Sequence, residues 1–177
     1  MKNLKRAVAV CLVLSMLVLC LTGCGKKNKV TQYRTTLNTY IEEIVQKDDD
    51  LEAAVSDAMA AIKVGDLTAY NEAMSKVQTL SGQLIESYRK IGNTEAPEEY
   101  RTQQVLLQQH VSSIINMIND AIELYTLAGK ELDGGLSETD IERIGALQTE
   151  IQMLTPAVES FDSVLNEVLG VSEESGK

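Results

Sequence analysis

The stretch 100–125, YRTQQVLLQQHVSSIINMINDAIELY, carries the periodicity that decides the fold. Its apolar residues recur at steps of three, four or seven: Tyr100, Leu107, Val111, Ile114, Ile118, Ile122 and Tyr125. Such steps place all of them on one face of an α-helix, because a helix turns once every 3.6 residues. The stretch therefore predicts a long amphipathic helix that must bury this stripe against other elements.

Three further segments repeat the pattern, at 30–62, 67–91 and 144–168. None of them alternates between apolar and polar residues with the period of two that a strand requires. Ala, Leu, Glu and Gln are abundant and the chain has only two prolines, a composition that favours helix. The sequence thus predicts an all-α fold, an up-down-up-down antiparallel four-helix bundle of long helices packed in the manner of a coiled coil.

Glycine, proline and capping residues mark the expected turns. Gly65, the segment 92–97 and the segment 133–135 separate the four helices. Ser137 precedes the fourth helix, and Asp140 follows three residues later, the spacing of a capping box.

Pro156 interrupts the fourth stripe. It lacks the amide hydrogen that would bond the carbonyl of Gln152, so the helix is expected to kink or break near Thr155-Pro156.

A different pattern begins the chain. A basic start and an apolar run at 7–21 lead into Leu21-Thr22-Gly23-Cys24, and the basic residues are Lys2, Lys5 and Arg6. This order resembles a bacterial lipoprotein signal peptide with its lipobox. The apolar run has about 15 residues, whereas a membrane-spanning helix needs roughly 20. The resemblance implies cleavage between Gly23 and Cys24, a diacylglyceryl group on the Cys24 sulfur and an N-acyl chain, often palmitate, on the new amino terminus.

The resemblance also implies a location and a division of the chain. We expect a protein held by its lipid at the extracytoplasmic face of the cell membrane. Residues 1–23 would be the cleaved signal peptide, 24–29 the lipidated anchor with a short basic linker, 30–170 the bundle domain and 171–177 a polar tail. The remainder of the chain resembles small all-helical lipoproteins of the cell envelope, whose function is undefined.

The relative lengths of the first two helices suggest a stalk at the membrane. The first, at about 33 residues, would be roughly 50 Å long, and the second, at about 25 residues, roughly 38 Å. The first helix should therefore extend beyond the bundle toward the membrane.

Charge is divided unevenly along the chain. Six of the 16 basic residues precede Val30, so the part from Val30 onward carries 10 Lys and Arg against 26 Asp and Glu, a net charge of −16. Lys26, Lys27 and Lys29 beside the expected anchor would be attracted to anionic lipid head groups. Such an acidic body argues against nucleic acid as a partner, because binding to phosphates requires positive charge.

No catalytic or cofactor motif occurs in the sequence. It has no glycine-rich phosphate loop, no nucleophile motif, and a single histidine, so we expect neither an enzyme, nor a cofactor, nor a metal site. The expected function is that of a non-enzymatic interaction or structural module of the cell envelope, whose partner would be an envelope protein or a small molecule. The alternative is a solute-binding or sensory bundle.

Polar residues that interrupt or border the apolar stripes are candidates for such a ligand site. Asp48 lies four residues after Ile44 and three before Leu51. Folding the helices back at their turns brings other polar residues toward a similar level: Ser81, Gln104, His110 and Thr155. This possible mid-bundle layer has three interpretations, which are a small-ligand site, a device that fixes helix register, or side chains that face water beside the stripe.

The aromatic residues should divide between the two ends of the bundle. The membrane-proximal group would comprise Tyr33, Tyr40, Tyr88, Tyr100 and Phe161, and the distal group Tyr70 and Tyr125. Both groups are expected in the core, and an aromatic-lined cleft at one end is the alternative.

Overall fold

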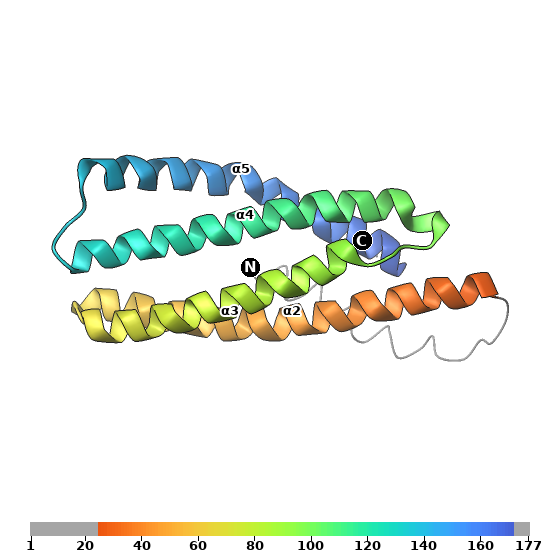
Figure 1. The fold of residues 1–177 in the computed structure, drawn as a ribbon, viewed down its shortest axis with the longest axis horizontal. Coiled ribbons are helices and arrows are strands. Elements are labelled where there is room, and N and C mark those ends of the chain that lie inside the picture. The colour runs from red at the N-terminus through yellow and green to blue at the C-terminus, as the bar shows by residue number, and fades with distance from the viewer. Residues whose placement is uncertain (1–24, 172–177) are drawn as a thin grey trace, which may run out of the picture.

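The computed structural model describes residues 25–171, with side chains from Asn28 onward. These residues form four long α-helices and one short 3₁₀ helix (Figure 1), and they contain no strand. The elements are α2 (Gly25–Val64), α3 (Leu67–Asn93), η2 (Glu98–Tyr100), α4 (Arg101–Leu132) and α5 (Glu138–Leu169). The predicted all-α four-helix bundle is confirmed.

Successive helices run antiparallel and pack side by side: α2 on α3, α3 on α4, and α4 on α5. We call the end that holds the start of α2 and the end of α5 the proximal end. The distal end holds the turn at Gly65-Asp66 and the loop 133–137. Figure 1 shows the proximal end on the right and the distal end on the left.

Capping residues mark the start of α3 and both ends of α5. The Asp66 carboxylate accepts a hydrogen bond from the amide of Ala69 and caps α3. Ser137 and Asp140 form the complete capping box of α5, because the side chain of each residue accepts a hydrogen bond from the backbone amide of the other. Gly170 ends α5 with a positive φ of 75°, a conformation that glycine adopts without strain.

The first helix is longer than the sequence predicts. α2 begins at Gly25 rather than Val30 and spans 40 residues, against 27 for α3. At 1.5 Å per residue these helices are about 60 Å and about 40 Å long. The lysine-rich segment expected as a linker is therefore helical from Gly25, and α2 extends beyond the bundle at its proximal end (Figure 1). The expected cleavage and lipidation positions, Gly23 and Cys24, lie outside the described residues, as do 172–177.

Pro156 does not break α5. The helix continues from Glu138 to Leu169 with Pro156 inside it. Figure 1 shows that α5 changes direction along its length, so that its second half crosses α4 and approaches the proximal end of α2. Such a bend fits a proline, which removes one backbone hydrogen bond and crowds the preceding turn.

The larger of two apolar clusters fills the proximal half, and all four long helices contribute to it. Its members are Tyr33, Leu37, Ile41 and Ile44 of α2, Leu84, Tyr88 and Ile91 of α3, Leu107, Val111 and Ile114 of α4, and Phe161, Leu165 and Val168 of α5. Two aromatic pairs lie here. Tyr33 stacks on Tyr100 with ring centroids 6.0 Å apart, and Phe161 meets Tyr88 edge-on at 5.7 Å.

The distal cluster is thinner and depends on small residues. Ala54, Ala58 and Ala61 of α2 pack against Tyr70, Ala73, Met74 and Val77 of α3, and Tyr125 and Leu132 of α4 lie against them. Alanine lets two helices approach closely and leaves little space to fill. Among the described residues, no member of this cluster comes from α5, whose first half packs on α4 instead.

Tyr70 joins α3 to α4 at the distal end. Its ring crosses to α4, where the hydroxyl donates a hydrogen bond to the Tyr125 carbonyl. The ring lies directly over Gly129, and a Cβ at that position would overlap ring carbons of Tyr70. Gly129 is therefore required in the last turn of α4, although glycine within a helix ordinarily costs about 0.5–1 kcal/mol relative to alanine.

Replacing Gly129 with alanine should thus destabilise the protein. Because the new methyl group must displace a buried ring, we expect Gly129→Ala to lower the free energy of unfolding by about 1–3 kcal/mol. The control is Gly145→Ala in α5, where no atom lies within 4 Å of the new Cβ. That change should stabilise by about 0.5–1 kcal/mol. Urea unfolding followed by circular dichroism measures both, and equal stabilisation by the two changes would contradict the proposed role of Gly129.

Candidate functional site

The polar residues that the sequence placed in one layer differ in their burial. Ser81 is buried, whereas Asp48 and His110 are half-buried. Thr155 is exposed on α5, and its hydroxyl donates a hydrogen bond to the Ile151 carbonyl 3.0 Å away. Its hydroxyl therefore serves its own helix.

Gln104 belongs to the proximal end rather than to a mid-bundle layer. The Tyr33 hydroxyl donates to its side-chain oxygen at 2.5 Å, and its side-chain nitrogen donates to the carbonyls of Ile91 and Gly92 at 2.9 and 2.8 Å. Tyr33 precedes Asp48 by 15 residues, or roughly 22 Å along α2. Gln104 thus bonds two carbonyls at the end of α3, of which that of Ile91 also accepts from the Thr94 amide at 3.2 Å.

Arg34 likewise donates a hydrogen bond to a backbone carbonyl at the end of α5. Its Nε donates to the Val168 carbonyl at 2.7 Å, and one Nη donates to the Tyr100 hydroxyl at 2.5 Å. The guanidinium therefore joins α2 to the end of α5 and to η2.

Burial, with a smaller contribution from Tyr100, raises the pKa of Tyr33 to about 12, so this tyrosine stays protonated and continues to donate its hydrogen bond to Gln104.

Two half-buried carboxylates lie near Tyr88 of α3. They belong to Asp48 of α2 and Asp162 of α5, and both are close enough to act on the Tyr88 hydroxyl electrostatically. Burial first, and these two carboxylates second, raise the pKa of the Tyr88 hydroxyl. Burial alone raises the pKa of Asp162 to about 6.

Asp162 was missing from the residues expected at the mid-bundle level. It lies four residues after Val158 and three before Leu165, which is the same position relative to its stripe that Asp48 occupies in α2. The spacing rule that selected Asp48 therefore also selects Asp162. The neighbouring Phe161 completes the apolar stripe and conceals this signal.

A second polar cluster joins α2 to α3. Lys47 Nζ donates to the Ser87 hydroxyl at 2.6 Å, and Glu43 accepts from Lys90 at 2.8 Å and from Ser87 at 3.2 Å. A lysine beside a serine can activate the hydroxyl as a nucleophile. Ser87, however, is 0% exposed, so a substrate has no access to it. This cluster aligns the two helices.

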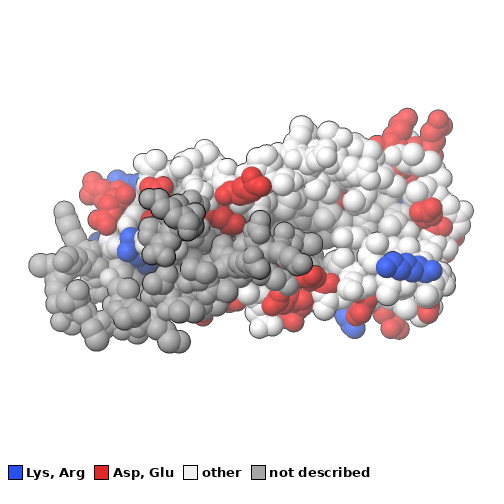
Figure 2. All heavy atoms as spheres, turned by 180° about the vertical axis from the view of Figure 1, so that it is seen from behind, with Lys and Arg blue, Asp and Glu red and all other residues white. Residues whose placement is uncertain are grey.

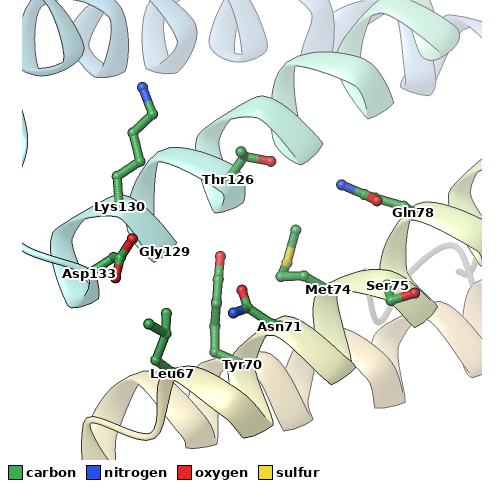
Figure 3. Close-up of a pocket in the computed structure, with 10 residues that line it drawn as sticks. All are labelled: Leu67, Tyr70, Asn71, Met74, Ser75, Gln78, Thr126, Gly129, Lys130 and Asp133. Atoms are coloured by element: carbon green, nitrogen blue, oxygen red, sulfur yellow. The ribbon is translucent and has the colours of Figure 1, made fainter.

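A groove of about 360 Å³ lies between α3 and α4 at the distal end (Figure 3). Its floor is formed by Tyr70, Met74 and Gly129. The side chains of Tyr70 and Met74 extend from α3 toward α4 (Figure 3). The walls carry polar residues spaced by four and three positions, which are Asn71, Ser75 and Gln78 on α3 and Thr126, Lys130 and Asp133 on α4. This volume lies within the roughly 300–1,000 Å³ typical of small-molecule sites.

The groove offers hydrogen bonds more than charge. The Lys130 side chain points away from it in Figure 3, and its ammonium pairs with Asp140 at 2.7 Å. That bond, with the Ser137 capping bonds, lowers the pKa of Asp140 to about 2. If the protein binds a ligand at an aromatic end, this groove beside Tyr70 is the candidate site.

The described surface is strongly acidic. Figure 2 shows several groups of Asp and Glu on one face and few Lys and Arg. Across the described residues, His, Cys, Asp and Glu nowhere form a group of three or more that could hold a metal ion. Within the same part of the chain, the helices are all too polar to span a lipid bilayer.

Comparison of the chain with family models, curated proteins and solved structures found no match.

Asp162 makes stability depend on pH. The folded protein holds this proton up to about pH 6, whereas an unfolded aspartate releases it near pH 4. Between these values the folded state binds more protons, so its stability falls as pH rises through the window. Asp162→Asn should therefore stabilise the protein by about 1–2 kcal/mol at pH 7, allowing for partial solvent access, and by much less near pH 4.

Urea unfolding of wild type and variant at both pH values measures this difference. Asp57→Asn, a change at an exposed aspartate of α2, is the control and should change little. A gain for Asp162→Asn that is equal at both pH values would show that ionisation of Asp162 is not the cause.

Proposed function

We propose that this chain is a lipid-anchored, extracytoplasmic lipoprotein that acts as a non-enzymatic interaction or structural module of the cell envelope. The observation that carries the proposal is Leu21-Thr22-Gly23-Cys24 at the end of a short apolar run with basic residues before it. A diacylglyceryl group with a further N-acyl chain would hold the protein stably, because one acyl chain alone binds membranes only marginally.

The length of α2 agrees with this proposal. The described residues are helical from Gly25 to Val64, which lies at the distal end. A lipid on Cys24 would therefore be followed by a long helix that leads into the bundle. Lys26, Lys27 and Lys29 would lie nearest the head groups and be attracted to anionic lipids, whereas the acidic bundle would be repelled.

The buried polar contacts support the non-enzymatic part. Within the described residues, every fully buried side-chain nitrogen or oxygen has a hydrogen-bond partner. The polar clusters around Gln104 and around Ser87 connect helices to one another, and these two central residues are themselves buried. Their geometry is that of structural supports.

Solute binding is the second candidate function, and the distal groove is the observation that favours it. The groove combines a buried aromatic and thioether floor with hydrogen-bonding walls, as small-ligand sites do.

The anchor is tested by Cys24→Ala. This change should abolish labelling of the protein with radioactive palmitate, leave the precursor uncleaved and release no lipid-modified form. Cys20→Ala is the matched control, since Cys20 lies within the apolar run and should be removed with the signal peptide; its labelling should equal that of wild type. Palmitate labelling of Cys24→Ala at the wild-type level would refute the anchor.

A further inference from the structure

We propose that the distal groove between α3 and α4 binds a neutral, polyhydroxylated ligand of one or two sugar units. This inference rests on the solute-binding candidate and names its ligand class. It requires no lipid on Cys24, so the two proposals can fail separately.

The first argument is the arrangement of the walls. Asn71, Ser75 and Gln78 follow one another at steps of four and three, so they line one side of α3 over two turns. At 1.5 Å per residue, the seven steps from Asn71 to Gln78 span roughly 10 Å. Thr126 lies on the α4 wall. These four side chains present a row of polar groups about as long as a disaccharide.

The second argument is the kind of hydrogen bond that the walls offer. The amides of Asn71 and Gln78 each have donors and an acceptor, and the Ser75 hydroxyl has both. The Thr126 hydroxyl donates to the Ile122 carbonyl at 2.8 Å, which leaves its oxygen as an acceptor. A sugar hydroxyl also donates and accepts, so adjacent hydroxyl groups on a ring can satisfy such a row without introducing a charge.

The third argument is the weak provision for charge. Lys130, the basic residue of the lining, points away and pairs with Asp140, so it offers little to an anion. The net charge of −16 from Val30 onward disfavours anions further. An amine would need a desolvated carboxylate, but Asp133 is exposed at the end of the groove, where water screens it.

The fourth argument is the fixed floor. Tyr70 is 2% exposed and Met74 is 6% exposed. The Tyr70 ring is held by its hydrogen bond to Tyr125 and by its contact with Gly129. The groove therefore keeps its shape without a ligand, and a ligand that binds there loses little free energy to rearrangement of the protein.

The experiment measures binding to the full-length chain, purified from membranes in a detergent without a sugar head group. Isothermal titration calorimetry uses N-acetylglucosamine and its β-1,4-linked dimer as neutral probes. Glucosamine and glucuronate share the ring but carry a positive and a negative charge. We expect saturable binding of the neutral probes, with the charged probes weaker by about tenfold or more, since they would bury an unpaired charge.

The double variant Asn71→Ala with Gln78→Ala should weaken binding of the neutral probes by about tenfold or more, because two wall amides are lost. Alanine favours helix at both positions, and circular dichroism checks that the fold is kept. The matched control is Asn119→Ala with Gln148→Ala, which removes an exposed Asn and an exposed Gln outside the groove and should leave binding unchanged.

Three results would overturn the inference. No saturable heat with any probe would remove the groove as a ligand site and solute binding with it. Stronger binding of glucosamine or glucuronate, lost in the double variant, would keep the site but refute the neutral ligand class. Equal binding of the neutral probes to wild type and to the double variant would place the ligand elsewhere. The palmitate labelling of Cys24 is unaffected by any of these results.

Discussion

The proximal core is the constraint on which the rest of the structure depends, because only there do the apolar stripes of all four long helices meet. Each of the four helices contributes a fully buried side chain to it: Leu37, Ile91, Leu107 and Val168. Burial of such side chains stabilises by about 1.5–3 kcal/mol each before the opposing entropy is counted. The second half of α5 is thereby fixed, and the bend in that helix follows from it: α5 packs on α4 at its start and must cross toward α2 at its end.

Because helices end against this core, backbone carbonyls at their ends need hydrogen-bond partners, and two side chains of the proximal end supply them. Helix ends leave backbone carbonyls without partners, and α3 and α5 both end against the core. Gln104 takes the carbonyls of α3, and Arg34 takes a carbonyl of α5. Asp162 directly follows Phe161, a core residue, and is half-buried, so burial raises the pKa of its carboxyl group to about 6. The stability of the protein therefore depends on the protonation of this carboxyl group.

Much of this architecture could be predicted from periodicity and capping alone. The spacing of Leu107, Val111 and Ile114 on α4 determines one buried face, and Ser137 with Asp140 marks where α5 starts. Local patterns of this kind suffice because helix hydrogen bonds and caps join residues that are close in the chain.

The site residues were harder to predict, because their neighbours are distant in sequence. Gln104 was expected beside Asp48, yet it bonds to Tyr33, and that choice depends on the offset between α2 and α4. Counting residues back from the turns assumes straight helices of ideal pitch in full contact, whereas α5 bends and packs along α4 for its first half. A cleft at an aromatic end was an open alternative, but its polar walls on α3 and α4 could not be predicted, because they depend on how these two helices pack beside Tyr70 and Gly129.

The two proposals place different tasks at opposite ends of one helix pair. If Cys24 carries the lipid, α2 leads from the membrane through the rigid proximal core to the turn at Gly65. The groove lies beside the start of α3, which follows that turn, and so would stand roughly 50 Å from the anchor. The alanine side chains of the distal cluster let α2 and α3 lie close together, while the Tyr70 ring lies between α3 and α4. The same Tyr70 ring that packs in the distal core therefore forms the floor of the groove, so a ligand there would contact a side chain that also holds α3 and α4 together.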